Sequence, residues 1–171
     1  RLVRDIALIL IAPLLLYLLA CLVTHSHTDP SWSSQTGVLP ADVHNIGGPV
    51  GAWISDVLLQ LFGFMAYPLP LILGAIAWIA LFGIDRDGDG RADFGPALRL
   101  AGIVGFLITG AGLLALRFPE LVNYPGGGGG ILGRLVGNTL KAGLGAFGGN
   151  LLLLALFLVS VTLATGLSWF A

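Results

Sequence analysis

The run from Ile6 to Val23 constrains this chain most, because it is eighteen consecutive residues without a charged side chain. A hydrocarbon core about 30 Å thick is crossed by about 20 helical residues, each of which rises 1.5 Å. The run therefore predicts a membrane-spanning helix. Arg1 and Arg4 precede it as they would in a signal peptide, but its length and the lack of a small-residue cleavage site favour a span.

The composition of the whole chain is that of a membrane protein. Of 171 residues, 56% are hydrophobic and only 10% are charged, whereas soluble domains have about 25% charged residues. The net charge of −1 gives no reason to expect nucleic acid at the chain's own surface. The single cysteine, Cys21, excludes an intrachain disulfide. Because the chain starts at Arg1 and stops directly after an apolar run, we expect it to be a piece of a longer protein.

A segment that begins near Asn45 recurs 82 positions later. The matching residues are Gly47, Gly48, Gly51, Leu58 and Gly63 in the first copy and Gly129, Gly130, Gly133, Leu140 and Gly145 in the second. In both copies a glycine pair opens the segment, a glycine closes it, and an apolar run follows. A fixed offset indicates an internal duplication. Coincidence in a chain rich in Leu and Gly is the alternative.

These patterns predict an all-α membrane protein built as two similar hairpins, each with an amphipathic interfacial helix on its outer side. The predicted spans are about 6–24, 64–82, 98–116 and 151–170, and the predicted interfacial helices are about 49–62 and 131–144. Residues 1–171 thus form a single membrane domain. Five basic residues would lie inside (Arg1, Arg4, Arg86, Arg91 and Arg99) and three outside (Arg117, Arg134 and Lys141). This bias favours cytoplasmic N- and C-termini.

The charged residues argue against chemistry inside the bilayer. Every acidic and basic residue lies outside the predicted spans or at their margins. Charged residues within spans normally mark ion paths and proton relays. Proton-coupled transport and aspartyl proteolysis both need such residues inside the membrane, so the sequence argues against both functions. No HExxH motif for zinc proteolysis occurs either. We therefore expect no catalytic residue and no cofactor in this chain.

Two loops contain candidate metal ligands. Asp85, Asp87, Asp89 and Asp93 match positions of a calcium-binding loop, but the twelfth position, normally a bidentate Glu, is Pro96. A solvated loop is the favoured interpretation and calcium binding the alternative. The other candidate set, for zinc, consists of His25, His27, Asp29, Asp42 and His44. Histidines in a loop without a fixed scaffold are more often simply solvated, so we expect no metal there.

Two further sets of residues are candidates for contacts with other helices or proteins. A stripe of small residues lets a second helix approach closely, and it consists of Ala101, Gly105, Thr109 and Gly112. The amphipathic segments would offer a partner surface that consists of Trp53, Asp56, Arg134, Asn138 and Lys141. These segments either only delay entry into the next span or also contact a neighbouring subunit.

The chain resembles the N-terminal membrane domain of the FtsK/SpoIIIE family of bacterial DNA translocases, specifically the FtsK branch of Gram-negative bacteria. The residues that carry the resemblance are Asp29-Pro30-Ser31-Trp32, His44-Asn45-Ile46-Gly47-Gly48, Gly51-Ala52-Trp53 with Asp56, Phe62-Gly63, Gly130-Ile131-Leu132-Gly133, and Thr165-Gly166-Leu167-Ser168-Trp169. The resemblance covers nearly the whole chain. The Asp-rich segment near Asp87 is not part of the pattern.

The resemblance implies a four-span anchor, followed in the full protein by a linker and a hexameric ATP-driven motor that moves chromosomal DNA through the closing septum. It implies a location in the bacterial inner membrane at the division septum, contacts with divisome membrane proteins and the lipid bilayer, and a homo-oligomer. DNA would be contacted only through the motor, of which this sequence contains no GxxxxGK[ST] motif. The alternative is a channel or small-solute transporter, with the Ser- and Thr-containing fourth span and the segment near Pro68 and Pro70 as its pathway.

Overall fold

The computed structural model describes residues 2–34, 42–82, 95–119 and 127–166. These residues form five α-helices and no strand, so the predicted all-α class is confirmed for the described part of the chain. The helices are α1 (Leu2–Val23), α2 (Gly48–Phe62), α3 (Leu69–Phe82), α4 (Gly95–Arg117) and α5 (Gly130–Thr165), with a 3₁₀ helix, η2 (Gly63–Ala66), between α2 and α3.

Four helical stretches are long and apolar enough to cross a membrane: Arg4–Val23, Gly48–Ala66, Gly95–Arg117 and Gly130–Thr165. The second differs from our prediction of a span at 64–82. That segment is divided between η2, a turn at Tyr67 and Pro68, and the shorter helix α3. The division follows from the prolines, which have no N–H to donate. Hydrogen bonding therefore restarts, with Tyr67 N donating to Phe64 O and Ile72 N donating to Pro68 O.

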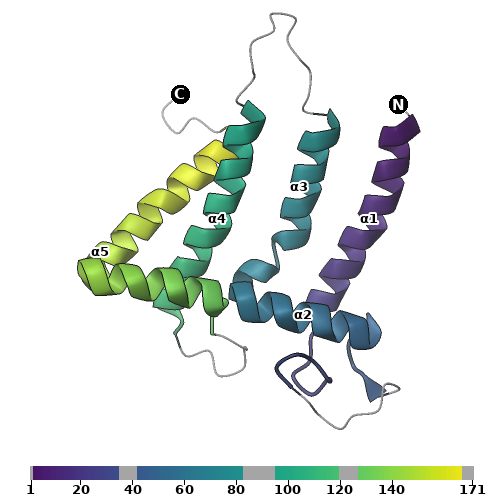
Figure 1. Ribbon diagram of the computed structural model, residues 1–171, viewed down its shortest axis with the longest axis horizontal. Helices are drawn as coiled ribbons and strands as arrows, with labels where there is room; N and C mark the ends of the chain where they lie inside the picture. Colours follow the sequence, from purple (N-terminus) through teal and green to yellow (C-terminus); the bar gives the residue numbers. More distant parts are fainter. Residues whose placement is uncertain (1, 35–41, 83–94, 120–126, 167–171) are drawn as a thin grey trace, which may run out of the picture.

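The helices are arranged in two directions (Figure 1). α1, α3 and α4 run alongside one another, whereas α2 lies across one end of them. α5 is bent, and its first half also lies across that end, while its second half runs back along α4. The start of α1 and the end of α5 both lie at the opposite end. We refer to α2 and residues 130–144 of α5 together as the crosswise bar.

The bend in α5 lies at Gly145, whose φ of 71° and ψ of 173° are not helical. Positive φ is accessible to glycine because it has no Cβ. Gly145 thus divides α5 into two helical parts, which correspond to the segments 131–144 and 151–170 that we predicted separately, as far as Thr165.

The glycines at the ends of the two crosswise helices have matching conformations. Gly48 and Gly130, which are 82 positions apart, open α2 and α5 with φ values of 64° and 63°. Gly63 and Gly145, also 82 apart, close the crosswise segments with φ values of 58° and 71°. The sequence repeat thus has a counterpart in the backbone. The copies differ after the closing glycine, where the first contains Pro68 and the second continues as helix.

The two halves of the bar meet end to end at a glycine junction formed by Gly63, Gly128 and Gly130 (Figure 1). Phe64 N donates a hydrogen bond to Gly128 O (3.0 Å). A Cβ on Gly63 would lie 2.6 Å from Gly130 N, and a Cβ on Gly130 would lie 2.6 Å from Leu61 O. The contact is between backbones, so these positions have no room for a side chain.

Packing within the bundle is closest between α4 and α5. A Cβ on Gly102 would lie 2.8 Å from Leu163, and Gly112 lies against Leu153, which is itself 1% exposed. A second, smaller core forms where α1, α2 and α3 meet, and it consists of Leu22, Leu59, Ala66 and Leu69. Most other apolar residues face outward.

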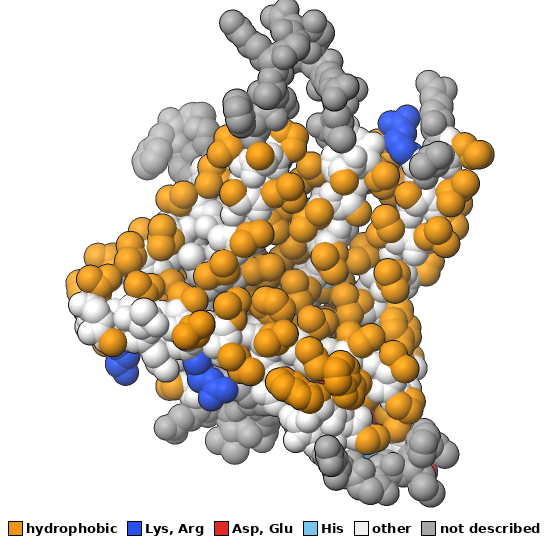
Figure 2. Space-filling model, in the orientation of Figure 1, with side chains coloured by type: hydrophobic (Ala, Val, Ile, Leu, Met, Phe, Trp, Pro, Cys, Tyr) orange, Lys and Arg blue, Asp and Glu red, His pale blue; other side chains and the backbone are white. Residues whose placement is uncertain are grey.

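Apolar side chains cover much of the surface in view, over both the upright helices and the bar (Figure 2). Examples are Ile9 at 70% exposure and Leu71 at 74%. Large contiguous apolar surfaces are rare on soluble monomers, and hydrocarbon is the environment in which such helices are stable. The surface fits a membrane location.

Candidate functional site

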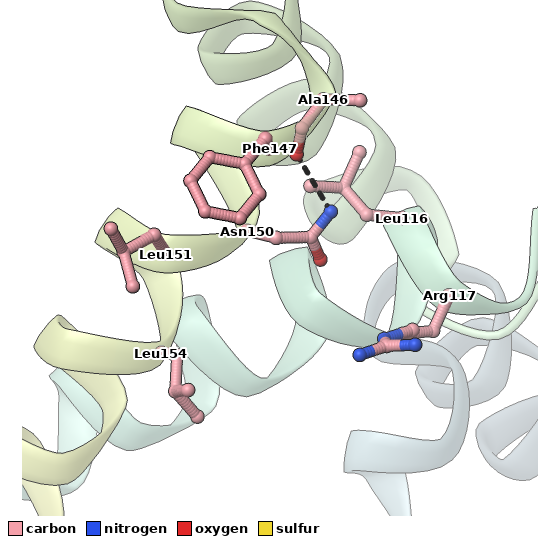
Figure 3. A pocket seen from close by; sticks show the side chains of 7 residues that line it. All are labelled: Leu116, Arg117, Ala146, Phe147, Asn150, Leu151 and Leu154. Atoms are coloured by element: carbon pink, nitrogen blue, oxygen red, sulfur yellow. Dashed lines mark hydrogen bonds between the residues drawn. The ribbon is translucent and has the colours of Figure 1, made fainter.

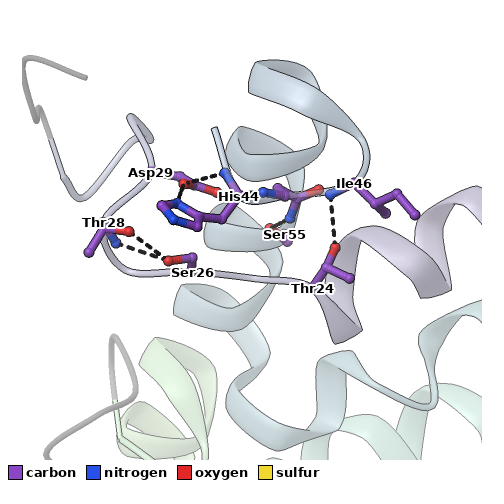
Figure 4. Close-up of polar contacts among 8 residues, drawn as sticks. Thr24, Ser26, Thr28, Asp29, His44, Ile46 and Ser55 are labelled. Carbon is purple, nitrogen blue, oxygen red and sulfur yellow. Dashed lines mark hydrogen bonds and ion pairs between the residues drawn. The ribbon is translucent and has the colours of Figure 1, made fainter. Parts of the chain in front are cut away.

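The loop between α1 and α2 folds into a hydrogen-bonded structure against both helices, which we call the polar cap. Its described members are Thr24, His25, Asp29, Ser33, His44, Asn45, Ser55 and Asp56. Figure 4 shows part of it. The described residues of this loop form no α-helix or strand, so side chains supply many of the bonds that order them.

Asp29 is the most buried member of the cap, with 0% exposure. One of its carboxylate oxygens accepts from His44 N (2.9 Å) and lies 3.2 Å from His44 Nδ1, and the other accepts from Asn45 N (2.8 Å). Burial by itself raises the pKa of Asp29, but the two backbone N–H groups and the His44 ring outweigh it and lower that pKa below its ordinary value. Asp29 therefore holds the loop in place through hydrogen bonds to its ionised carboxylate.

Asn45 joins the loop to both helices. Its Nδ2 donates to Cys21 O at the end of α1 (2.8 Å) and lies 3.4 Å from Ser55 Oγ on α2, and its Oδ1 accepts from Gly47 N (2.9 Å). The neighbouring Gly51 has no room for a side chain, since a Cβ there would lie 2.7 Å from Cys21 Sγ. The first copy of the glycine pattern thus serves a close approach of α2 to the end of α1.

Asp56 is a correction to our predicted partner surface. It is 1% exposed, and its two oxygens accept from Ser33 N (2.8 Å) and Ser33 Oγ (2.7 Å). A buried carboxylate is tolerated when donors saturate it. Asp56 fastens the loop to α2 from inside, and no partner can reach it on this chain.

His25 lies half-buried between the loop and α2. Its Nδ1 is 3.2 Å from Ser55 Oγ, and its ring meets the ring of His27 edge to face at 5.0 Å. Burial and the nearby His27 lower the pKa of His25, and Asp56 and Asp29 oppose this only in part. Its Nε2 has no hydrogen-bond partner among the described residues. His25 is therefore held in its neutral form.

The two sets of candidate metal ligands differ in how far the structure describes them. Among the described residues, no group of three or more His, Cys, Asp or Glu side chains is close enough together to hold a metal ion. This includes the zinc candidates of the loop, where Asp29 is already saturated by N–H donors. The calcium candidates Asp85, Asp87, Asp89 and Asp93 lie outside the described residues.

The small-residue stripe of α4 faces α5 of the same chain over most of its length. A Cβ on Gly105 would overlap Ser160 Oγ, and one on Gly112 would lie 3.1 Å from Leu153. Thr109 is buried and its Oγ1 donates to Gly105 O (2.7 Å). Ala101 alone is exposed. Of the stripe, only Ala101 is open to a helix from another chain.

The other predicted contact residues lie on the outside of the crosswise bar. Trp53 is 52% exposed, and Arg134, Asn138 and Lys141 are exposed on the first half of α5. Basic side chains are visible at this end of the molecule (Figure 2). The bar therefore presents a mixed polar and apolar surface.

A recess of about 580 Å³ lies at the bend of α5 (Figure 3). The end of α4 contributes Leu116 and Arg117, and α5 contributes Phe147, Asn150 and further leucines. Asn150 Nδ2 donates to Ala146 O (2.8 Å), but its Oδ1 is buried without a hydrogen-bond partner among the described residues. Phe147 is 83% exposed.

Sequence reasoning missed Asn45, Ser33 and Ser55 as members of the cap. An Asn followed by glycines is a turn signal, because its side chain bonds to the backbone two residues on. That signal was present at Asn45, which bonds Gly47 N. Nothing local predicted Ser33 or Ser55, because Ser33 bonds Asp56, which is 23 residues away along the chain, and Ser55 bonds His25, which is 30 residues away.

Comparison with known proteins adds to this geometry. The family model described as the 4TM region of DNA translocase FtsK/SpoIIIE matches residues 1–171. DNA translocase FtsK of Pseudomonas syringae pv. syringae is 36% identical over 167 residues, which are 98% of this chain and 21% of the relative. DNA translocase FtsK of Vibrio vulnificus is 34% identical over 154 residues, which are 90% of this chain and 15% of the relative. The match thus spans 21% of the length of the first relative and 15% of the second. No solved structure matches it.

Proposed function

Because this chain belongs to the family of the 4TM region of DNA translocase FtsK/SpoIIIE, we propose that it is the non-catalytic membrane anchor and assembly domain of a septal DNA translocase. In this role it acts in bacterial cell division and chromosome segregation. The observation that carries the proposal is the family match across all 171 residues, supported by helices long and apolar enough to cross a membrane.

The anchor would cross the membrane with α1, with η2 and α3 together, with α4 and with the second half of α5. α2 is long enough to span, but two observations favour an interfacial position. It lies across the other helices (Figure 1), and its Asp56 is bonded to Ser33 of the polar loop. A loop rich in polar backbone does not enter hydrocarbon, so α2 lies at the loop's level. The bar would then lie in the outer interface.

The proposed anchor consists of two similar hairpins with cytoplasmic termini, and the positions of the chain's described ends support this. The start of α1 and the end of α5 lie at one end of the molecule, opposite the bar (Figure 1). The excess of basic residues near Arg1, Arg86 and Arg99 favours that end as the cytoplasmic one. A motor domain of the kind that the family resemblance implies would then act on the side where the chromosome is.

No enzymatic step is assigned to this chain. Its described charged residues lie in the loop, on the bar or at helix ends. Arg4, Arg99 and Arg117, for example, lie near the ends of the upright helices. The ATP-driven movement of DNA belongs to the remainder of such a protein. The exposed residues of the bar, Trp53, Arg134, Asn138 and Lys141, are the surface we propose for divisome membrane proteins or for a neighbouring copy in a homo-oligomer.

A localisation experiment tests the proposal. The chain, fused at its N-terminus to a fluorescent protein so that this protein lies on the same side of the membrane in test and control, is expressed in a dividing Gram-negative bacterium. We expect a fluorescent band at midcell in constricting cells. The control is a fusion of residues 1–34, which keeps one span but lacks the bar. Uniform envelope fluorescence of the whole chain, equal to that of the control, would contradict a septal function.

A further inference from the structure

The glycine junction joins the end of the first crosswise helix to the start of the second, and it leaves two equivalent ends unused. The start of α2, at Gly48, is the repeat equivalent of Gly130. The bend of α5, at Gly145, is the equivalent of Gly63. No atom lies within 4 Å of a Cβ built on Gly48 or on Gly145, whereas Gly63 and Gly130 are in backbone contact.

The unused ends expose apolar side chains where the occupied junction buries its own. Met65, two residues after Gly63, packs against Gly110 of α4, where a Cβ would lie 2.8 Å from its Sδ. Its repeat equivalent, Phe147, is 83% exposed beside the recess. At the other end, Ile46 and Val50 are 73% and 63% exposed. These three apolar side chains are therefore exposed, although the backbone at the start of α2 bonds the cap through Ile46 N and Thr24 Oγ1.

These ends are complementary and not alike. The bend at Gly145 is equivalent to the Gly63 side of the junction, and the start of α2 at Gly48 is equivalent to the Gly130 side. The bend of one copy can therefore fit the start of α2 of a second copy, head to tail. The two unused ends of a single copy cannot reach each other. Two crosswise helices of 15 residues each, end to end, hold the unused ends about 45 Å apart. The orientation of the bar across the upright helices keeps both ends at the same level (Figure 1).

We propose that a second copy of this chain docks head to tail, with the start of its α2 seated at the bend of α5. Ile46 and Val50 of one copy lie against Phe147 and the recess of the next, and the Gly48–Gly145 contact repeats the Gly63–Gly130 contact. Such a heterologous interface propagates, and it closes into a ring if the rotation between copies permits. The inference deepens the assembly role proposed above and rests on it.

Crosslinking between engineered cysteines tests the docking. Ile46→Cys and Phe147→Cys are introduced together into the chain in lipid nanodiscs and membranes, and a short thiol-reactive crosslinker is added. The native Cys21 is buried at 0% exposure and serves in the unsubstituted chain as the background. We expect a ladder of dimers and larger species from the double variant. An equimolar mixture of the two single variants should stop at dimers.

The controls separate this interface from other contacts. Ile46→Cys with Leu135→Cys keeps two exposed thiols, since Leu135 is 66% exposed in the middle of the bar, and should lose the ladder. A ladder of equal strength in that control would overturn the proposal. Dimers of equal yield from Phe147→Cys alone would show a symmetric interface and also overturn it. Septal fluorescence without a ladder would refute this docking but leave the anchor function intact, and a ladder with uniform fluorescence would do the reverse.

Discussion

Two buried carboxylates, Asp29 and Asp56, hold the loop that precedes α2. Each is at most 1% exposed, and each receives hydrogen bonds on both oxygens from loop residues. A buried charge without donors is costly, so the loop and the carboxylates stabilise one another. At the scale of single residues, these two acidic side chains have a structural role, because loop donors already occupy their oxygens.

We predict that Asp56→Asn lowers the free energy of unfolding by about 1–3 kcal/mol, because two hydrogen bonds to a carboxylate become weaker hydrogen bonds to a neutral amide, with Ser33 Oγ forced to accept instead of donate. Ser33→Ala removes only the hydroxyl bond and should cost about 1 kcal/mol. Thermal unfolding of the chain in nanodiscs measures both. Asp5→Asn, at an exposed position of α1, is the control and should be nearly neutral. Equal stability of Asp56→Asn and the parent chain would refute the fastening role.

We also predict that the cap loses stability on acidification. The pKa of His25 in the folded chain is below its ordinary value of 6.5. The contribution of neutral His25 to the free energy of unfolding is therefore complete above pH 6.5, and it is lost as the pH falls through the lowered pKa. The pKa of Asp29 is likewise lowered from 3.8, so its contribution is lost only in stronger acid. Between pH 7.5 and 5.5 the melting temperature should therefore fall because of His25.

The histidines offer matched variants for that measurement. His25→Gln should flatten the dependence of melting temperature on pH between 7.5 and 5.5, whereas His27→Gln, at an exposed position, should keep most of it. A pH dependence that is unchanged in His25→Gln would show that another group carries it.

At the scale of helices, glycines decide which faces come together. α4 approaches α5 closely because Gly102, Gly105 and Gly112 present no side chain to Leu163, Ser160 and Leu153. In a bilayer, where the hydrophobic effect does not drive helices together, this contact is a main source of cohesion. The exposed Ala101 lies on the same helix but makes no such contact.

Gly105→Leu should destabilise the chain by about 1–3 kcal/mol or more, because its Cβ would overlap Ser160 Oγ and force α4 from α5. Ala101→Leu is the matched control on the exposed face, and we expect its melting temperature to be nearly that of the parent chain. If Ala101 contacts a neighbouring copy, that variant should change the oligomer size instead. Unchanged melting of Gly105→Leu would show that α4 and α5 are not held at this position.

On the scale of the whole molecule, the upright helices and the crosswise bar divide the functions of anchoring and contact. The upright part exposes apolar side chains to lipid, and the bar holds the polar cap and the exposed basic residues (Figures 1 and 2). Among the described residues, no Asp, Glu, Lys, Arg or His lies in the middle of the upright helices. Such a molecule can hold a position in a membrane without offering a path through it.

Two measurements in vesicles examine this division. Labelling of single cysteines placed near Arg4 and Thr165 should report the same side of the membrane, and a cysteine at Trp53 the other. Vesicles that contain the chain should pass ions no faster than empty vesicles, because no charged or polar path crosses the upright helices. Labels on opposite sides would overturn the hairpin arrangement, and rapid flux would favour the channel alternative.

The sequence by itself determined the helical class, the apolar stretches and the positions of the glycines. These depend on local quantities: an apolar run such as Ile6–Val23 cannot be solvated, and an opening or closing glycine such as Gly145 permits a backbone conformation that other residues resist. The family resemblance was readable for the same reason, because its motifs are short and local.

Only the tertiary structure decided which residues are buried and what they touch. Asp56 lies on a helix face that the sequence predicted to be exposed to solvent. The loop covers this face, and its Ser33 donates a hydrogen bond to Asp56. The small-residue stripe looked suited to another chain, and α5 of the same chain covers most of it. Burial depends on contacts between segments far apart in sequence. Helical periodicity carries no information about which segment packs against a given helix face.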